Sequence, residues 1–273
     1  VWDIANNFSE VLEGHNEKVM QCYVSKDSNY FYTIGGFEVL VWELSSSLPT
    51  RQVSSQPDRI SQILINGLKE CAICNRSHYI DFIHLASGNR VAFYEPLEQV
   101  ICIEQSKDQR VLFILTRKKV IKYSITTNSE MHQAEYPRGE YSLNSKLKVT
   151  EDKVLLATGK GIEIYTVADL HLRSTIELNS KCIEVSNDES KLFVGKSKGE
   201  IEIYDLSNLG LFKHTKEHCS EIKHLQITSD DKLLVSSEST KIRIWFVETM
   251  ECFRNIIPGG EINTFCLTNQ EKF

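Results

Sequence analysis

The sequence predicts an all-β protein, specifically a seven-bladed β-propeller of four-stranded antiparallel blades. One observation is a recurring phrase, which reads IEIYTV at 162–167, IEIYDL at 201–206 and IRIWFV at 242–247. The second is a series of aromatic residues about 40 positions apart, namely Trp2, Trp42, Phe82, Tyr123, Tyr165, Tyr204 and Trp245. An even period of this length is typical of repeat proteins, in which each unit buries its apolar faces against its neighbours.

Each period contains four short runs that favour β-strands. In the first period they are VMQCYVS (19–25), YFYTI (30–34), FEVLVWEL (37–44) and TRQVSS (50–55), and the last period repeats this order at 222–228, 233–237, 241–247 and 250–257. β-Branched and aromatic residues fill the runs, and Gly, Asp, Asn and Ser separate them, as expected for strands joined by turns. Four such strands make a propeller blade, whereas a β-sandwich would need no even spacing.

The register also predicts how the chain is divided among blades. The first strand of each blade is taken to be the one nearest the axis. These first strands are expected to begin near 19, 60, 100, 145, 181, 222 and 262, and the first six of them start complete blades. The seventh is expected to be composite or truncated, with its innermost strand at 262–269 and its outer two strands within 1–13. Its second strand would follow Phe273 or be missing. We therefore expect residues 1–273 to form one propeller, or a slice through a longer or tandem one.

At this point the residues resemble the WD-repeat family of β-propellers, whose repeats carry Gly-His before the innermost strand and Trp-Asp at the end of the third. Gly14-His15 precedes Trp42, and His218 precedes Trp245, by the same 27 positions. The family's Ser-Pro-Asp-Gly turn between the first two strands is matched by turns with Asp27, Asp108, Asp188 and Asp230. The resemblance covers the whole chain as a degenerate form of the repeat.

The resemblance implies a hydrogen-bonded set of His, Ser or Thr, Trp and Asp inside a blade. The matching structural residues are His15, Thr33 and Trp42, then His218, Ser236 and Trp245. Only two repeats keep the His, and the turns at 35–36 and 238–240 contain no Asp. We therefore expect sets of three members at most, and blades that are stabilised mainly by apolar stacking.

The composition excludes several classes of protein. A net charge of −6 and a pI near 5.8 argue against direct nucleic-acid binding as the main role. No run approaches the roughly 18 apolar residues of a membrane span. Eight cysteines lie in strand-like runs, which favours free thiols in an intracellular protein, with the cytoplasm preferred and the nucleus left open. The pair in CAIC (71–74) has zinc-site spacing but no second pair, so we expect no metal or cofactor.

The sequence contains no glycine-rich phosphate loop, GxSxG turn or HExxH pair, so we expect no enzyme. The histidines at 214, 218 and 224 fall on different segments, which argues against a shared metal. An enzyme on this fold would place its site at the central channel, where Glu104, Glu184 and His224 are the obvious residues. We do not expect these three to recur at one level of the channel.

The resemblance implies a noncatalytic scaffold that binds other proteins in a multiprotein complex, through loops on one face of the propeller. In this chain those loops lie around His15, 35–36, 117–119, 196–198 and 238–240, and 45–59 is another surface segment. The candidate partner-binding residues are Arg117, Lys118, Lys119, Lys196 and Lys198. Alternatives are binding of a phosphopeptide, a phosphoinositide or nucleic acid through local lysines.

Overall fold

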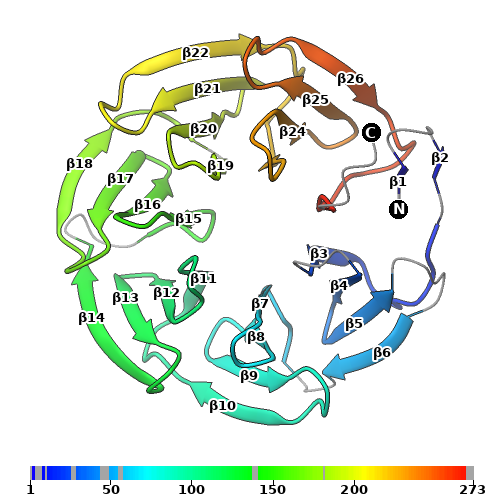
Figure 1. Ribbon diagram of the computed structural model, residues 1–273, viewed down its shortest axis with the longest axis vertical. Helices are drawn as coiled ribbons and strands as arrows, with labels where there is room; N and C mark the ends of the chain where they lie inside the picture. The colour runs from blue at the N-terminus through cyan, green and yellow to red at the C-terminus, as the bar shows by residue number, and fades with distance from the viewer. Residues whose placement is uncertain are drawn as a thin grey trace. The chain divides into compact units, whose positions relative to one another are not determined.

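The chain is an all-β propeller of four-stranded antiparallel blades. The computed structural model describes residues 2–3, 8–9, 11–25, 29–43, 49–54, 58–136, 141–180 and 182–268, and no α-helix occurs among them (Figure 1). They therefore include no helix that could cross a membrane. Two compact units are present: the first comprises 1–95 with 263–273, and the second comprises 96–262.

The first unit contains two four-stranded blades and a two-stranded pair. One blade consists of β3 (Val19–Val24), β4 (Tyr30–Gly35), β5 (Glu38–Glu43) and β6 (Pro49–Ser54). The other consists of β7 (Gln62–Asn66), β8 (Cys71–Asn75), β9 (Ile80–His84) and β10 (Arg90–Tyr94). The pair is formed by β1 (Trp2–Asp3) and β2 (Phe8–Ser9).

The second unit contains four blades. The first two are β11 (Val100–Gln105), β12 (Val111–Thr116), β13 (Lys119–Ser124) and β14 (Ser129–Glu135), then β15 (Lys146–Val149), β16 (Lys153–Thr158), β17 (Gly161–Thr166) and β18 (Leu172–Ile176). The last two are β19 (Cys182–Val185), β20 (Lys191–Gly195), β21 (Glu200–Asp205) and β22 (Leu211–Lys216), then β23 (His224–Ile227), β24 (Leu233–Ser237), β25 (Ile242–Phe246) and β26 (Cys252–Ile256).

Within every blade the strands follow one another as an antiparallel meander. We call the turn between the first and second strands the a–b turn, the turn between the second and third strands the b–c turn, and the link to the next blade the d–a connection. In the second unit the first strands β11, β15, β19 and β23 lie side by side in succession (Figure 1). The a–b turns therefore share one rim of this unit, and the b–c turns share the opposite rim with the d–a connections.

Apolar side chains fill the space between neighbouring blades. Leu115 of β12, Leu156 of β16 and Tyr165 of β17 belong to one buried cluster. Second strands such as β16 are buried at almost every position because a blade covers each of their faces. This explains why their sequences are continuous apolar runs and do not alternate with polar residues.

The periodic aromatic residues lie where the sequence predicted them. Trp42, Phe82, Tyr123, Tyr165, Tyr204 and Trp245 are all on third strands, and all are buried. Trp2 lies on β1, but its side chain is outside the described part of the chain. The 40-residue period is thus confirmed as the spacing of third strands.

A β-bulge interrupts each fourth strand beside the periodic aromatic residue. The extra residue is Thr50, Val91, Met131, Arg173, Phe212 or Phe253, depending on the blade. Four of these side chains, those of Val91, Met131, Phe212 and Phe253, are large, apolar and exposed. The bulge is the one irregularity that all six blades share among the described residues.

The expectation of seven blades is wrong: the described residues form six. Of the predicted composite blade, β1 and β2 pair with each other, while 262–268 lies outside any strand and 269 is outside the described residues. An innermost strand is held by the second strand beside it. No described segment provides that partner, so the backbone of 262–268 has no ladder to join.

Candidate functional site

The two His-containing blades form the side-chain sets that the family resemblance implied. In the β3–β6 blade, Thr33 Oγ1 accepts a hydrogen bond from Trp42 Nε1 at 2.7 Å and lies 2.7 Å from His15 Nε2. In the β23–β26 blade, Ser236 Oγ accepts one from Trp245 Nε1 at 2.7 Å and lies 2.6 Å from His218 Nε2. The buried indole N–H groups thereby gain the acceptors they need.

Space around His15 depends on a glycine. A Cβ atom at Gly35 would lie 2.4 Å from His15 Nδ1, closer than two unbonded atoms approach. Gly35 ends β4 at the b–c turn of the same blade. The glycine at this turn therefore allows the imidazole to reach the Thr33 hydroxyl.

Glu238, which sequence reasoning missed, lies beside the second set but forms no hydrogen bond with His218. Its Oε2 atom accepts hydrogen bonds from the backbone N–H groups of Cys219 and Ser220, at 3.0 and 2.9 Å, and lies 3.6 Å from His218 Nδ1. Burial opposes ionisation of this carboxyl, but the hydrogen bonds from Ser220 outweigh it and lower the pKa of Glu238. The hydrogen-bonded set of this blade therefore has three members, His218, Ser236 and Trp245.

His218 makes the stability of the second unit depend on pH. Burial lowers the pKa of His218 to about 4, although the nearby Glu238 carboxylate acts in the opposite direction. An unfolded His titrates near 6.5. Between pH 6.5 and 4 the unfolded chain therefore binds a proton that the folded protein does not, and stability falls as pH falls.

We expect the free energy of unfolding, measured with urea, to be lower at pH 5 than at pH 7. In His218→Asn this free energy should change less between the two pH values. His224 has its pKa lowered to about 4 as well, by burial and by Lys146 and Lys223, so the double variant His218→Asn/His224→Asn should flatten the slope further. Equal slopes in the three proteins would contradict the assignment.

In two other blades the aromatic residue of the third strand is a tyrosine, and it has a different polar partner. On β17, Tyr165 donates a hydrogen bond to Glu163 at 2.9 Å, and the Tyr141 hydroxyl lies 3.0 Å from that of Tyr165. On β21, Tyr204 donates to Glu202 at 2.7 Å. Residues two apart in a strand share a face, which explains the repeated IEIY phrase: its Glu accepts from its Tyr.

The β7–β10 blade contains a buried ion pair instead. Arg76 Nε and Asp81 Oδ2 are 2.7 Å apart and both side chains are fully buried. Arg90 Nη1 lies 3.3 Å from the other carboxylate oxygen of Asp81 and is half-exposed. This blade lacks the His and Trp of the repeat. Asp81 lies on its third strand, β9, and Arg76 lies in its b–c turn.

Polar residues on the first strands of the second unit form a row. Glu104, Lys148 and Glu184 each stand two positions before the Ser or Thr that opens the a–b turn. Lys148 Nζ lies 2.9 Å from Glu184 Oε1. Burial raises the pKa of Glu104, and although burial disfavours the Lys148 ammonium, the carboxylates of Glu184 and Glu104 raise the pKa of Lys148.

Glu104, Glu184 and His224 do not all share one level of the first strands, although the positions of Glu104 and Glu184 are equivalent. His224 stands two positions earlier, beyond this row. No group of three or more His, Cys, Asp or Glu residues that could hold a metal ion occurs in the described ranges. The row therefore consists of two carboxyl groups and one lysine, and Lys148 forms its ion pair with Glu184.

The a–b turns of the second unit share an internal design. In these turns a Ser or Thr hydroxyl donates to an Asp two residues later: Ser106 to Asp108, Ser186 to Asp188 and Thr228 to Asp230 at 2.5 to 2.6 Å, and Thr150 to Asp152 at 3.2 Å. The hydrogen bond from Ser186, followed by those from Ser190, lowers the pKa of Asp188 to about 2. The sequence singled out Asp108, Asp188 and Asp230, while Asp27 lies outside the described residues.

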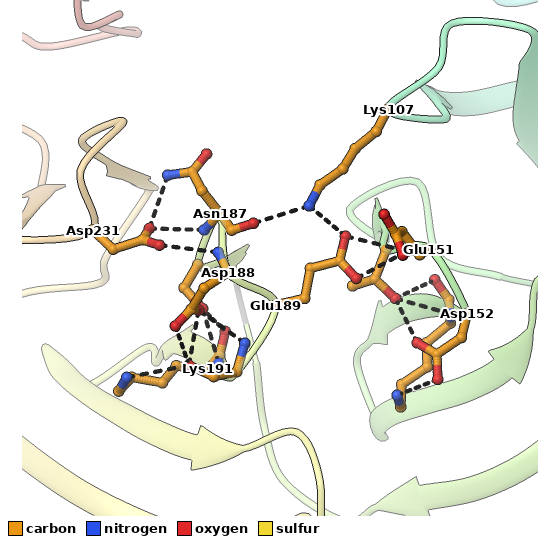
Figure 2. Close-up of polar contacts among 12 residues, drawn as sticks. Lys107, Glu151, Asp152, Asn187, Asp188, Glu189, Lys191 and Asp231 are labelled. Atoms are coloured by element: carbon orange, nitrogen blue, oxygen red, sulfur yellow. Dashed lines mark hydrogen bonds and ion pairs between the residues drawn. The ribbon is translucent and has the colours of Figure 1, made fainter.

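The residues beside the turn aspartates connect different blades of the second unit (Figure 2). We call Lys107, Glu151, Asn187, Glu189 and Asp231 the inter-blade relay. Lys107 Nζ lies 2.6 Å from Glu189 Oε1, which also accepts from the Glu151 backbone N–H. Asp231 accepts from the Asn187 backbone and side-chain N–H groups, at 2.7 and 2.8 Å. All four blades of the second unit are therefore connected along the a–b rim.

Asp231→Asn should lower the free energy of unfolding by about 1 kcal/mol, because the variant amide loses part of the acceptor capacity of the carboxylate. Asn is chosen because it tolerates the positive φ of 58° at this position. Urea denaturation measures the change, and Glu251→Gln, an exposed carboxylate outside the relay, serves as the matched control. Equal effects of the two substitutions would speak against the relay.

The five basic residues are not gathered into one site. Arg117, Lys118 and Lys119 lie at the b–c turn of the β11–β14 blade, while Lys196 and Lys198 lie at the b–c turn two blades further on. Lys196 forms an ion pair with Glu202, so its charge is already engaged. Lys118 and Lys198 are exposed. The same rim presents these two turns with the β15–β18 blade between them.

Comparison with known proteins supports a WD-repeat-like β-propeller. The family model described as Nucleolar protein 10-like, N-terminal domain, matches residues 143–271, just under half of the chain. Nucleolar protein 10 of Xenopus tropicalis is 33% identical over 75 residues, which are 27% of this chain and 11% of that protein. Over 108 residues, a WD repeat-containing protein 3 homolog of Dictyostelium discoideum is 27% identical, covering 34% of this chain and 12% of the relative. The chain thus spans about a tenth of the length of these curated relatives.

Proposed function

We propose that this WD-repeat-like propeller is a noncatalytic scaffold that binds other proteins within a multiprotein complex, and that residues 1–273 act as one propeller. The observation that carries the proposal is the inter-blade relay, because it fixes the spacing of four consecutive blades at one rim. Binding to a pre-ordered surface avoids the entropic cost of ordering it. The opposite rim keeps exposed turns that can contact partners.

The nucleolus is the compartment we propose. The matching family model and two of the relatives carry the name Nucleolar protein 10. The comparisons give no support to the cytoplasmic expectation from the sequence. A fluorescent fusion of the intact protein should therefore concentrate in nucleoli, and an even cytoplasmic signal would contradict this proposal.

The partner-binding residues we propose are Arg117, Lys118, Lys119 and Lys198. Lys196 is left out because Glu202 and Tyr204 form a local hydrogen-bonded group with it on the same blade. We assign the first-strand row a structural role, because Lys148 pairs with Glu184 there. Binding of phosphorylated ligands and binding of nucleic acid are the alternatives, and the test below separates the second of them.

The test is affinity purification of the intact protein from its own cells, followed by size-exclusion chromatography with and without ribonuclease. A scaffold should migrate in a large complex with stoichiometric protein partners, and ribonuclease should leave those partners bound. Migration as a monomer would overturn the proposal. Loss of every partner after ribonuclease treatment would favour nucleic-acid binding instead.

A further inference from the structure

Two exposed leucines lie beside the basic b–c turn of the β11–β14 blade. Leu97, on the d–a connection before β11, has 98% of its surface exposed, and Leu143, on the d–a connection before β15, has 56% exposed. Lys118 at the turn is also exposed. We call Leu97, Lys118 and Leu143 the leucine–lysine patch.

Hydrogen bonds hold the first side of the patch in place. The Arg117 backbone N–H donates to the Gln99 carbonyl at 3.2 Å, and the Lys118 backbone N–H donates to Glu98 Oε2 at 3.1 Å. Glu98 Oε2 also accepts a hydrogen bond of 2.9 Å from Thr116. The connection that carries Leu97 is thus fastened to the turn that carries Lys118.

The d–a connection that carries Leu143 is also hydrogen-bonded to this b–c turn. The Tyr141 N–H donates to the Arg117 carbonyl and the Tyr136 N–H to the Lys118 carbonyl, both at 2.6 Å. The rings of Tyr136 and Tyr141 stack with centroids 4.1 Å apart, and the Tyr141 hydroxyl contacts Tyr165. Leu143 therefore follows a buried anchor only two residues away, and the patch is ordered before any partner binds.

The charge of the patch is available to a partner. Among the described residues no carboxylate forms an ion pair with Lys118, and the same holds for Lys160 at the next b–c turn. Glu98 is already engaged by the turn itself. Glu135 is exposed nearby, opposite Lys119 across the β13–β14 pair. A ligand at the patch thus meets two aliphatic side chains and an unneutralised ammonium group.

We propose that the leucine–lysine patch binds an acidic segment of a partner protein that carries leucine or phenylalanine side chains between its carboxylates. The inference rests on the scaffold function proposed above and specifies its partner. Aliphatic side chains bury apolar surface against another protein, whereas nucleic-acid bases bind to aromatic platforms. The net charge of −6 also opposes a continuous polyanion more than a segment with a few carboxylates.

The test is selection of a phage-displayed library of random 12-residue peptides on the immobilised intact protein. Enriched peptides should combine Asp or Glu with Leu or Phe, and fluorescence anisotropy then measures their Kd. Lys118→Gln and Leu97→Ser/Leu143→Ser should each weaken binding at least tenfold. Lys232→Gln, at an exposed a–b turn on the opposite rim, and Leu211→Ser, an exposed outer-strand leucine, are the matched controls and should leave Kd unchanged. Thermal unfolding checks that each variant folds.

Three results would overturn the proposal: recovery of no binding peptide, enrichment of peptides without acidic residues, or equal effects of patch and control variants. A 20-nucleotide polyuridine probe that binds more tightly than the peptides and loses affinity in Lys118→Gln would assign the patch to RNA instead. The scaffold function is judged separately. If protein partners copurify equally with wild type and with Leu97→Ser/Leu143→Ser, the scaffold function is supported and the role of the leucine–lysine patch is rejected. If the protein binds the peptides but migrates as a monomer in cell extracts, the patch is supported and the scaffold function is rejected.

Discussion

Trp245→Ala is expected to lower the free energy of unfolding by about 3 to 5 kcal/mol, the usual cost of emptying a large aromatic site in a core. The Trp245 side chain is fully buried in the cluster that joins the last two blades. Its removal leaves a cavity there and also takes away the indole donor from Ser236. Urea denaturation monitored by circular dichroism measures the change.

Variants of the same set separate packing from hydrogen bonding. Trp245→Phe keeps most of the volume but loses the N–H donor, so it should cost clearly less than Trp245→Ala. Trp42→Ala should behave like Trp245→Ala, because Trp42 makes the same contacts with Thr33 in the β3–β6 blade. A negligible shift in both alanine variants would show that these indoles do not support the blades.

Asp81→Ala should be the other severe substitution, at about 3 to 5 kcal/mol, because it leaves a buried guanidinium without its counter-charge. Arg76 and Asp81 are both fully buried, and the distance between their charged groups is 2.7 Å. The cost comes mainly from the stranded Arg76. The double variant Arg76→Met/Asp81→Leu should therefore recover much of the stability that Asp81→Ala loses.

Arg90 supplies the matched control for this prediction. It approaches the same carboxylate at 3.3 Å, but its side chain is 47% exposed. Ion pairs at exposed positions contribute about 0 to 1 kcal/mol, so Arg90→Ala should change the unfolding midpoint little. A loss as large as that of Asp81→Ala would mean that burial does not decide the energetics of this group.

The strand order of each blade could be predicted because local patterns determine it. Third strands were located by buried aromatic residues such as Tyr123 and Tyr204, and turns by their polar residues. The number of blades could not be predicted in the same way. A terminal segment such as 262–268 is as apolar as a real first strand, and only the presence of a neighbouring strand decides whether it pairs.

The polar contacts were harder to predict, since they depend on how side chains reach across turns and between blades. The turn at 238–240 contains no Asp, so the sequence predicted no acidic partner there, yet the Glu238 carboxylate caps the Cys219 and Ser220 amides. Glu189 and Asp231 stand next to the turn aspartates Asp188 and Asp230, but nothing in the sequence pattern singled them out. Their partners lie 38 to 82 residues away in the sequence, so the local sequence pattern does not indicate them.

The bulge in every fourth strand has a consequence for solubility. A straight outer strand with exposed Val, Met or Phe would offer its free backbone groups as a template on which a second molecule could add a strand and begin aggregation. The extra residue at Met131, Phe212 or Phe253 breaks the regular spacing of those groups at the point where the apolar side chain is most exposed. The irregularity that each repeat retains therefore acts as a guard against self-association of its outer edge.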